Sequence, residues 1–211
     1  MAQALLTKDE KKIIKHGLWD ANPITFQILG ICSSLAVTTQ LKPALFMSFG
    51  LTFVTALSNV VISLMRNYIP SKIRIIVQLT VVSALVISLD QVLRAYFFDI
   101  SKQLSVFVGL IITNCIVMGR LEAFAMGNPP WKSFLDGMAN GLGYSAVLII
   151  IAVIREILGS GTLLGFHVIP AEAYANGYVN NGMMVLAPGA FFLLGIIVWL
   201  QRAISGYSEK A

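Results

Sequence analysis

The sequence has 211 residues, of which 57% are hydrophobic and only 12% are charged. Soluble domains usually carry about 25% charged residues, so this chain cannot cover a globular core with a water-facing surface. The formal net charge of +5 comes from basic residues near the ends of apolar segments and gives no reason to expect a nucleic-acid partner. The composition instead predicts an all-α, multi-pass membrane protein in contact with membrane lipids.

Apolar segments recur along the chain at lengths that suit transmembrane helices, which need about 20 mostly apolar residues. Six candidate spans are found, at residues 21–41, 43–65, 75–93, 103–119, 137–154 and 183–201. The second, third, fifth and sixth are strongly apolar, whereas the first and fourth are short or interrupted by polar residues and glycine. We therefore expect residues 1–211 to form a single polytopic membrane domain of six transmembrane helices.

Positive charges indicate the orientation of these spans, because cytoplasmic loops carry an excess of lysine and arginine. With six spans, the N-terminal segment, the second and fourth loops and the C-terminus share one side and hold 11 of the 15 basic residues. The opposite side holds the remaining four, which are Lys42, Arg94, Lys102 and Arg155. We therefore expect both termini to face the cytoplasm.

The weak first and fourth spans fall at equivalent places in two halves of three spans, at residues 20–97 and 102–203. Each weak span contains one cysteine, Cys32 in the first and Cys115 in the fourth. Because three is an odd number, the second half must enter the membrane from the opposite side, which makes a 3+3 inverted repeat. Interrupted spans at equivalent positions of such repeats indicate a functional site near the midplane of the membrane.

The two cysteines are the strongest candidates for chemistry. A single cysteine in a membrane helix is usually a small buried hydrophobe, but a pseudo-twofold axis would bring these two close together. Two thiolates cannot complete a tetrahedral zinc site, and a two-iron cluster needs four ligands. From the residues alone, three interpretations remain: two buried hydrophobes, a disulfide, or half of a metal site that another chain completes.

Three of the acidic residues in or beside the spans are candidates for a structural or functional role. Asp90 is deep in the third span, where an ionisable group is costly and indicates function unless it is paired. It either forms a structural ion pair with Arg94, one helical turn later, or contributes to an ion pathway. Asp136 is predicted to open the fifth span, and Glu156 is predicted to cap its end at the membrane surface.

Motifs for soluble cofactors are absent from the sequence. There is no GxGxxG fingerprint, no Walker loop and no HExxH zinc motif, and no pair of intramembrane histidines suits a haem. His16 and His167 are isolated outside the spans. We therefore expect no NADH site and no complete active site in this chain.

The segments around the cysteines resemble a known family. GICSSLAVTT at residues 30–39 and SVFVGLIITNCIVMGR at residues 105–120 are similar to the two cysteine motifs of the membrane subunits shared by two bacterial complexes. These are the sodium-translocating NADH:quinone reductases, through their D subunit, and, less closely, the Rnf electron-transport complexes, through their E subunit. Asp90 and the SKQL run at residues 101–104 favour the quinone-reductase branch, and the resemblance covers the whole chain.

This resemblance implies a [2Fe-2S] cluster held between this chain and a paralogous E subunit of opposite topology. Cys32 and Cys115 match the two cysteines that the family contributes, and the partner provides the other two. It further implies a six-subunit complex in the bacterial inner membrane, in which the A, B, C and F subunits complete the assembly and other chains carry NADH, the flavins and the quinone. The chain would relay electrons across the membrane within a sodium-exporting enzyme.

Two further hypotheses come from other classes of protein. The first is an inverted-repeat transporter of ions or small solutes without a redox centre, in which Asp90 and the serine- and threonine-rich stretch after Cys32 form a polar site. The second is a purely structural membrane subunit. Iron content and visible absorbance of the purified complex distinguish the electron carrier from both.

Overall fold

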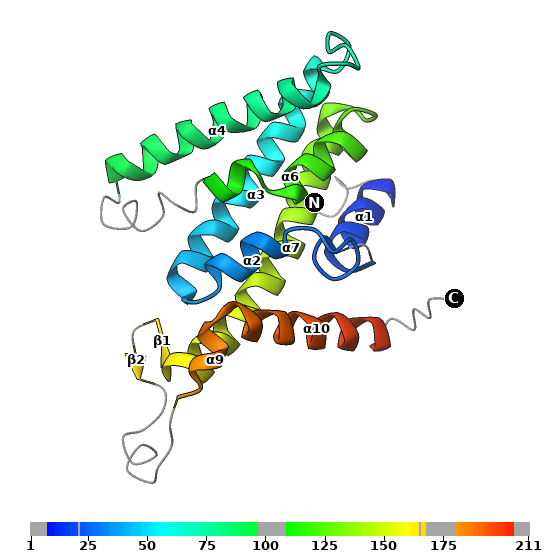
Figure 1. Cartoon of the computed structure of the whole chain (residues 1–211). Helices are drawn as coiled ribbons and strands as arrows, with labels where there is room; N and C mark the ends of the chain where they lie inside the picture. The colour runs from blue at the N-terminus through cyan, green and yellow to red at the C-terminus, as the bar shows by residue number, and fades with distance from the viewer. Residues whose placement is uncertain (1–7, 21, 97–108, 165, 168–179, 205–211) are drawn as a thin grey trace, which may run out of the picture.

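The computed structural model describes residues 8–20, 22–96, 109–164, 166–167 and 180–204. Within these ranges the chain is almost entirely helical (Figure 1). The elements are α1 (Lys8–Lys15), the π-helix η2 (His16–Asp20), α2 (Ile31–Val37), α3 (Leu41–Met65), α4 (Arg74–Tyr96), α6 (Cys115–Arg120), the π-helix η3 (Leu121–Ala125), α7 (Pro130–Ser160), β1 (Thr162–Leu163), β2 (Phe166–His167), α9 (Gly182–Val185) and α10 (Ala187–Ile204). The prediction of a mostly helical membrane protein is confirmed.

Four helices of the described residues are long and apolar enough to cross a membrane: α3, α4, α7 and α10. They correspond to the second, third, fifth and sixth predicted spans. The segments predicted as spans one and four contain only short helices. In the first, turns at residues 23–30 precede the seven-residue α2. In the fourth, helical residues 109–112 are separated from α6 by Thr113 and Asn114, and residues 103–108 lie outside the described residues.

The fifth span is longer than predicted, and its boundaries have clear local causes. α7 begins at Pro130, where a proline at the first helical position loses no hydrogen bond. It ends at Gly161, which adopts φ 68° and donates its N–H to the Ile157 carbonyl. The prediction that Asp136 opens this helix is therefore wrong, because Asp136 lies in its second turn.

The helices α3 and α7 form the centre of the molecule (Figure 1). Two glycines of α7 allow the close approach: a Cβ on Gly137 would lie 2.8 Å from the Ala56 Cα, and one on Gly141 would lie 2.8 Å from the Thr52 Cα. Small residues spaced by four are the usual means of packing membrane helices backbone to backbone. The α3–α7 pair is therefore the rigid element on which the other segments are placed.

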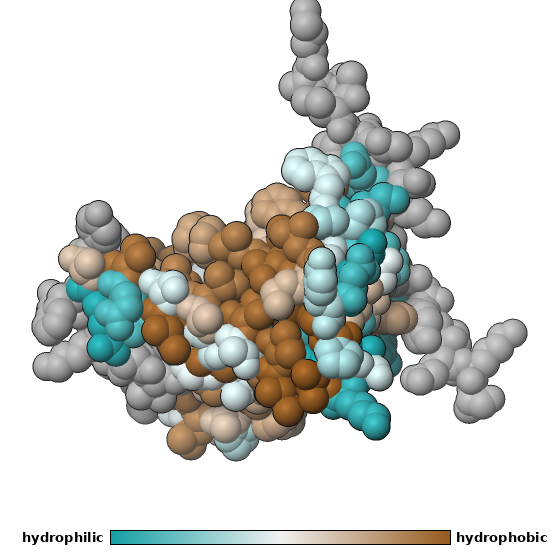
Figure 2. Space-filling model, turned by 90° about the horizontal axis from the view of Figure 1, so that it is seen from above, coloured by the Kyte–Doolittle hydropathy of each residue, from teal (hydrophilic) through white to brown (hydrophobic). Residues whose placement is uncertain are grey.

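The helices α4 and α10 lie on opposite sides of this pair (Figure 1). Only 22% of the apolar window of α4 and 17% of that of α10 are buried, against 61% for α3 and 56% for α7. Figure 2 shows a broad hydrophobic area across one face, with hydrophilic residues toward both of its sides. An exposed apolar band of this kind suits contact with lipid or protein and not with water.

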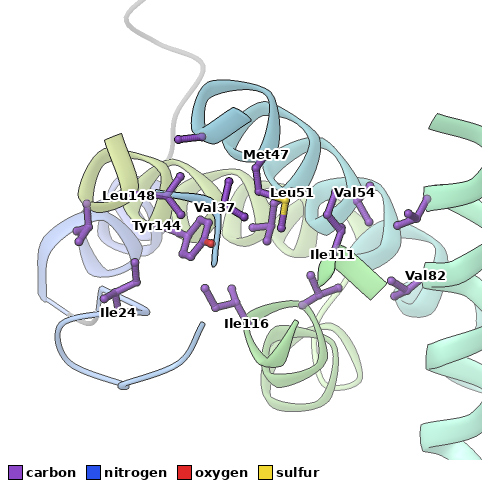
Figure 3. Packing of buried hydrophobic residues seen from close by; sticks show 14 of the residues in the cluster. Ile24, Val37, Met47, Leu51, Val54, Val82, Ile111, Ile116, Tyr144 and Leu148 are labelled. Carbon is purple, nitrogen blue, oxygen red and sulfur yellow. The ribbon is translucent and has the colours of Figure 1, made fainter. Parts of the chain in front are cut away.

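The main apolar core lies where α2, α3, α6 and α7 converge (Figure 3). Val37 of α2, Leu51 of α3, Ile116 of α6 and Tyr144 of α7 are all fully buried there. After α7 the chain forms a two-stranded antiparallel hairpin of β1 and β2, in which Thr162 pairs with His167. Residues 168–179 lie outside the described residues.

Candidate cofactor site

Both cysteines lie in the first turn of a short helix. Cys32 is the second residue of α2, and Cys115 is the first residue of α6. The residue before each helix explains why the chain breaks there. Gly30 adopts φ 76°, in the left-handed region that favours glycine. Asn114 is extended, and its side-chain oxygen accepts the Ile116 N–H at 3.1 Å, as N-cap residues do.

Two hydrogen bonds join these helix starts across the molecule. The Gly30 N–H donates to the Cys115 sulfur over 2.9 Å, and the Asn114 side-chain amide donates to the Ser33 hydroxyl over 3.0 Å. The structure thus brings together the two cysteine-bearing segments that the sequence places far apart. Both thiols are free; Cys32 is exposed and Cys115 is partly buried.

Tyr144 of α7 lies beneath both helix starts and is fully buried (Figure 3). Its hydroxyl is 2.8 Å from the Ser33 hydroxyl. Ser33 thereby connects Tyr144, Asn114 and the carbonyl of Gly30. Tyr144 was not predictable as a site residue, because an aromatic residue in an apolar span looks like an ordinary core residue.

The hydroxyls that follow Cys32 mostly serve the helix backbone. Ser34 donates to the Ile31 carbonyl over 2.8 Å, and Thr38 donates to the Ser34 carbonyl over 2.5 Å. The hydroxyls of this serine- and threonine-rich stretch could hydrogen-bond to sulfur or to the helix backbone. Ser34 and Thr38 bond to the backbone, which is the commoner use. Ser33 is the member that faces the site.

The far end of α6 is fixed to α7 by a buried ion pair. The Arg120 guanidinium donates through Nε and Nη2 to the two carboxylate oxygens of Asp136, at 2.9 and 2.5 Å. Asn140 adds a third donor to the same carboxylate at 3.0 Å. Asp136 therefore holds the Cys115 helix in place from inside α7, which explains how an acid can be buried there.

The far end of α2 is held by α7 as well, through Arg155. Its Nη1 donates to the Leu35 carbonyl and to the Thr38 hydroxyl, at 3.2 and 2.5 Å. Asp136 is near the start of α7 and Arg155 is near its end, so α2 and α6 run in opposite directions from starts that meet beside Tyr144. Arg155 was predicted to lie near the end of the fifth span on the outer side, but its side chain is buried.

Glu156 does not cap the end of its own helix, and that prediction is wrong. Its carboxylate is buried and accepts the N–H of Leu41, the first residue of α3, at 2.6 Å. The other oxygen accepts the N–H of Leu164 at 2.9 Å. A carboxylate can be buried at this place because each oxygen has a backbone donor.

Asp90 lies on α4, away from this group of residues. Its Oδ2 accepts from the Arg94 Nε at 2.8 Å, so the ion pair considered from the sequence is present. Its Oδ1 is buried and has no hydrogen-bond partner among the described residues. No hydrogen bond within the described part of the chain links Asp90 to the cysteine segments.

The donor set suits half of a thiolate-ligated metal centre. Two free thiols lie at adjoining helix starts, and one sulfur already accepts a backbone N–H, as ligating sulfurs in iron-sulfur proteins do. No cluster of three or more cysteine, histidine, aspartate or glutamate side chains exists among the described residues. The two cysteines supply two of the four ligands that such a centre needs, and Cys32 is exposed.

Replacing Gly30 with alanine tests this geometry. A Cβ at position 30 would lie 2.6 Å from the Ile116 Cδ1. The alanine would also have to keep a positive φ, which is unfavourable for any residue with a side chain. The complex should therefore lose about 2–4 kcal/mol of stability. A thermal melt of the purified complex measures the loss. Gly195→Ala on α10 is the control, because no atom lies within 4 Å of the added Cβ. Equal melting temperatures for the two variants would contradict the packing described here.

The chain is similar to known proteins over most of its length. Residues 10–198 match the protein family described as "Rnf-Nqr subunit, membrane protein". The chain is 58% identical to the D subunit of the Na(+)-translocating NADH-quinone reductase of Pseudoalteromonas atlantica, over 94% of each chain. It is 57% identical to the D subunit of the Photobacterium profundum reductase, also over 94% of each chain, and 54% identical to that of Yersinia pestis, over 94% of this chain and 95% of the relative. The chain therefore belongs to the Rnf-Nqr family of membrane subunits.

Proposed function

We propose that this chain is the D-type membrane subunit of a bacterial Na⁺-translocating NADH:quinone reductase and relays electrons through a [2Fe-2S] cluster shared with a paralogous E subunit. The observation that carries the proposal is the meeting of Cys32 and Cys115 at the starts of two short helices. The full-length similarity to proteins named as the D subunit of such a reductase supports the choice of complex. NADH, the flavins and the quinone would be bound by other subunits.

The chain's own residues would prepare half of the cluster's ligand set. When bound, such a cluster accepts and donates one electron at a time. Gly30 and Asn114 precede the short helices α2 and α6 and place each thiol in a first helical turn. The Gly30 N–H stabilises negative charge on the Cys115 sulfur. Tyr144 and Ile116 are fully buried, whereas Cys32 is exposed and can be reached by a partner.

We also propose that the six segments form a 3+3 inverted repeat with both termini in the cytoplasm. The opposite directions of α2 and α6, with their starts meeting beside the middle of α7, support this arrangement. Two of the counted basic residues, Arg155 on the outer side and Arg120 on the cytoplasmic side, are held inside the protein. Without them the excess on the cytoplasmic side remains, at ten basic residues against three.

Purification of the intact complex through a tag on this chain tests the proposal. The E subunit should be present in the preparation, with two non-haem irons and two labile sulfides beyond those of other iron-sulfur centres. NADH-dependent quinone reduction should be accompanied by sodium export. Ferredoxin:NAD⁺ activity would identify the Rnf branch instead, and a complex without this iron would favour the transporter or structural hypotheses.

The second part of the proposal is that Asp90 assists the passage of sodium. Its buried Oδ1 has no partner among the described residues, and hard cations prefer oxygen ligands. Asp90→Asn should raise the sodium concentration for half-maximal turnover severalfold with the cluster intact, whereas Arg94→Gln should leave that concentration unchanged. Titration of turnover against sodium measures both. An unshifted curve for Asp90→Asn, together with equal losses of stability in the two variants, would show a purely structural ion pair.

A further inference from the structure

Two adjacent buried residues near the end of α7, Arg155 and Glu156, contact several segments that are distant in sequence. Only 1% of Arg155 and 5% of Glu156 is exposed. Arg155 donates to five oxygens: those of Leu35 and Thr38 at the end of α2, and the carbonyls of Met184, Val185 and Leu186 at the end of α9. Glu156 accepts the backbone N–H groups of Leu41 and Leu164.

These contacts lie on both sides of one corner of the chain. Residues 38–40 connect α2, which carries Cys32, to α3. Arg155 binds oxygens where α2 ends, and Glu156 binds the N–H where α3 begins. Each residue thus satisfies backbone groups that a helix end leaves without a partner. Together they fix the direction of α2 relative to α3.

A helix of seven residues is not stable by itself, because isolated helices shorter than about 12–15 residues are marginal even with favourable sequences. α2 therefore depends on tertiary contacts, which include the burial of Val37 in the core and hydrogen bonds at its two ends. At its start Ser33 contacts Tyr144, and at its end Leu35 and Thr38 contact Arg155. Loss of the contacts at either end of α2 should let the helix and Cys32 move.

The partners of Arg155 in the structure are unusual for a buried cation. All five oxygens that accept from it are neutral, and its neighbour Glu156 is occupied by backbone donors. Removing a guanidinium from water is costly unless it is well hydrogen-bonded. A shorter or apolar side chain could fill this space without that cost but could not reach the ends of both α2 and α9.

We propose that Arg155 and Glu156 are positioning residues for Cys32, holding the α2–α3 corner against α7 so that the thiol keeps a fixed place relative to Cys115. The consequence for the cluster rests on the function proposed above, whereas the mechanical role does not. The α9 and β1–β2 segments share the same two side chains, so the outer loops and the cysteine helix are fixed by a single pair of residues.

A matched pair of threonine variants separates this contact from an ordinary loss of a hydroxyl. Thr38 and Thr80 both donate to the carbonyl four residues earlier, but only Thr38 also accepts from Arg155. Thr38→Val should therefore loosen α2, and Thr80→Val on the exposed side of α4 should not. Arg155→Lys, which keeps the charge but loses the planar fork of donors, should have a larger effect than Thr38→Val.

Hydrogen–deuterium exchange of the intact purified complex measures the mechanical role directly. Backbone amides of residues 31–40 should exchange roughly tenfold faster or more in Thr38→Val and Arg155→Lys, while residues 115–125 and the Thr80→Val control keep the exchange of the unmodified complex. Unchanged exchange at residues 31–40 in both site variants would overturn the proposal. Should Arg155→Lys fail to assemble, the isosteric Thr38→Val variant still decides the matter.

The reduction potential of the cluster tests whether Arg155 and Glu156 determine the position of the Cys32 thiol. With full iron content, the potential and the electron paramagnetic resonance line shape should shift in Thr38→Val and Glu156→Gln and stay constant in Thr80→Val. Faster exchange at α2 with an unchanged potential and line shape would show that Arg155 and Glu156 only stabilise the fold. That result would overturn their role in positioning Cys32. Absence of a cluster in the unmodified complex would contradict the proposed function instead, and the exchange data would still decide on the mechanical role.

Discussion

Replacing Cys32 or Cys115 with serine is expected to abolish the shared [2Fe-2S] cluster. The chain has only two cysteines, so each variant leaves one thiolate from this side, and a cluster that needs four ligands would keep three. Loss of an outer-sphere partner of a metal site already costs about 10–100-fold. Quinone reduction and sodium export should therefore fall by roughly two orders of magnitude or more.

The control for the cysteine variants is internal to the complex. NADH oxidation with artificial electron acceptors should continue at the normal rate, because it needs only the flavin-carrying subunits of the proposed assembly. Electron paramagnetic resonance of the reduced complex and its iron content report on the cluster itself. Normal quinone reductase activity in both serine variants would count against the relay role of this chain.

Removing the guanidinium of Arg120 is expected to give the largest loss of stability. Asp136 is 3% exposed, and Arg120 donates to both of its carboxylate oxygens. Breaking one side of a buried ion pair costs about 3–5 kcal/mol, because the remaining charge stays buried. Arg120→Met should therefore release α6 from α7 and lower the amount of assembled complex, as measured by a thermal melt and by the level of the chain in membranes.

Two companion variants make the Arg120 result specific. Arg120→Met combined with Asp136→Leu should recover most of the lost stability, since apolar replacement of both partners is often neutral. Arg74→Met is the matched control, because the Arg74–Glu122 pair is more than one-third exposed on each side and should contribute less than about 1 kcal/mol. A loss for Arg74→Met as large as that for Arg120→Met would contradict the assignment of the Arg120–Asp136 pair as the main anchor.

Hydropathy predicted the four long helices because burial in a membrane needs nothing beyond an uninterrupted apolar stretch. The weak first and fourth spans were also recognisable, since they are short or interrupted by glycine and polar residues. The single cysteine in each, at equivalent places in the two halves, was the signal that brought the two segments into one hypothesis. The contact between Gly30 and the Cys115 sulfur could not be predicted, because it depends on how α2 and α6 are placed on α7.

The errors concern charged residues. Asp136, Arg155 and Glu156 were assigned to the ends of span five or to a loop, because charge inside a membrane is costly. Each is instead buried against a partner that is distant in sequence: Arg120, the end of α2 and the start of α3, respectively. Hydropathy counts the cost of burying a charge and has no information on a compensating partner, so it places such residues at the surface.

The most direct test of the account is to locate the iron. X-ray anomalous scattering at the iron edge from crystals of the intact complex would show where iron lies relative to the two cysteines. The account predicts one two-iron centre bonded to the sulfurs of Cys32 and Cys115 and to two thiolates of the partner subunit. Iron found only in other subunits, with Cys32 and Cys115 facing lipid or joined in a disulfide, would contradict it.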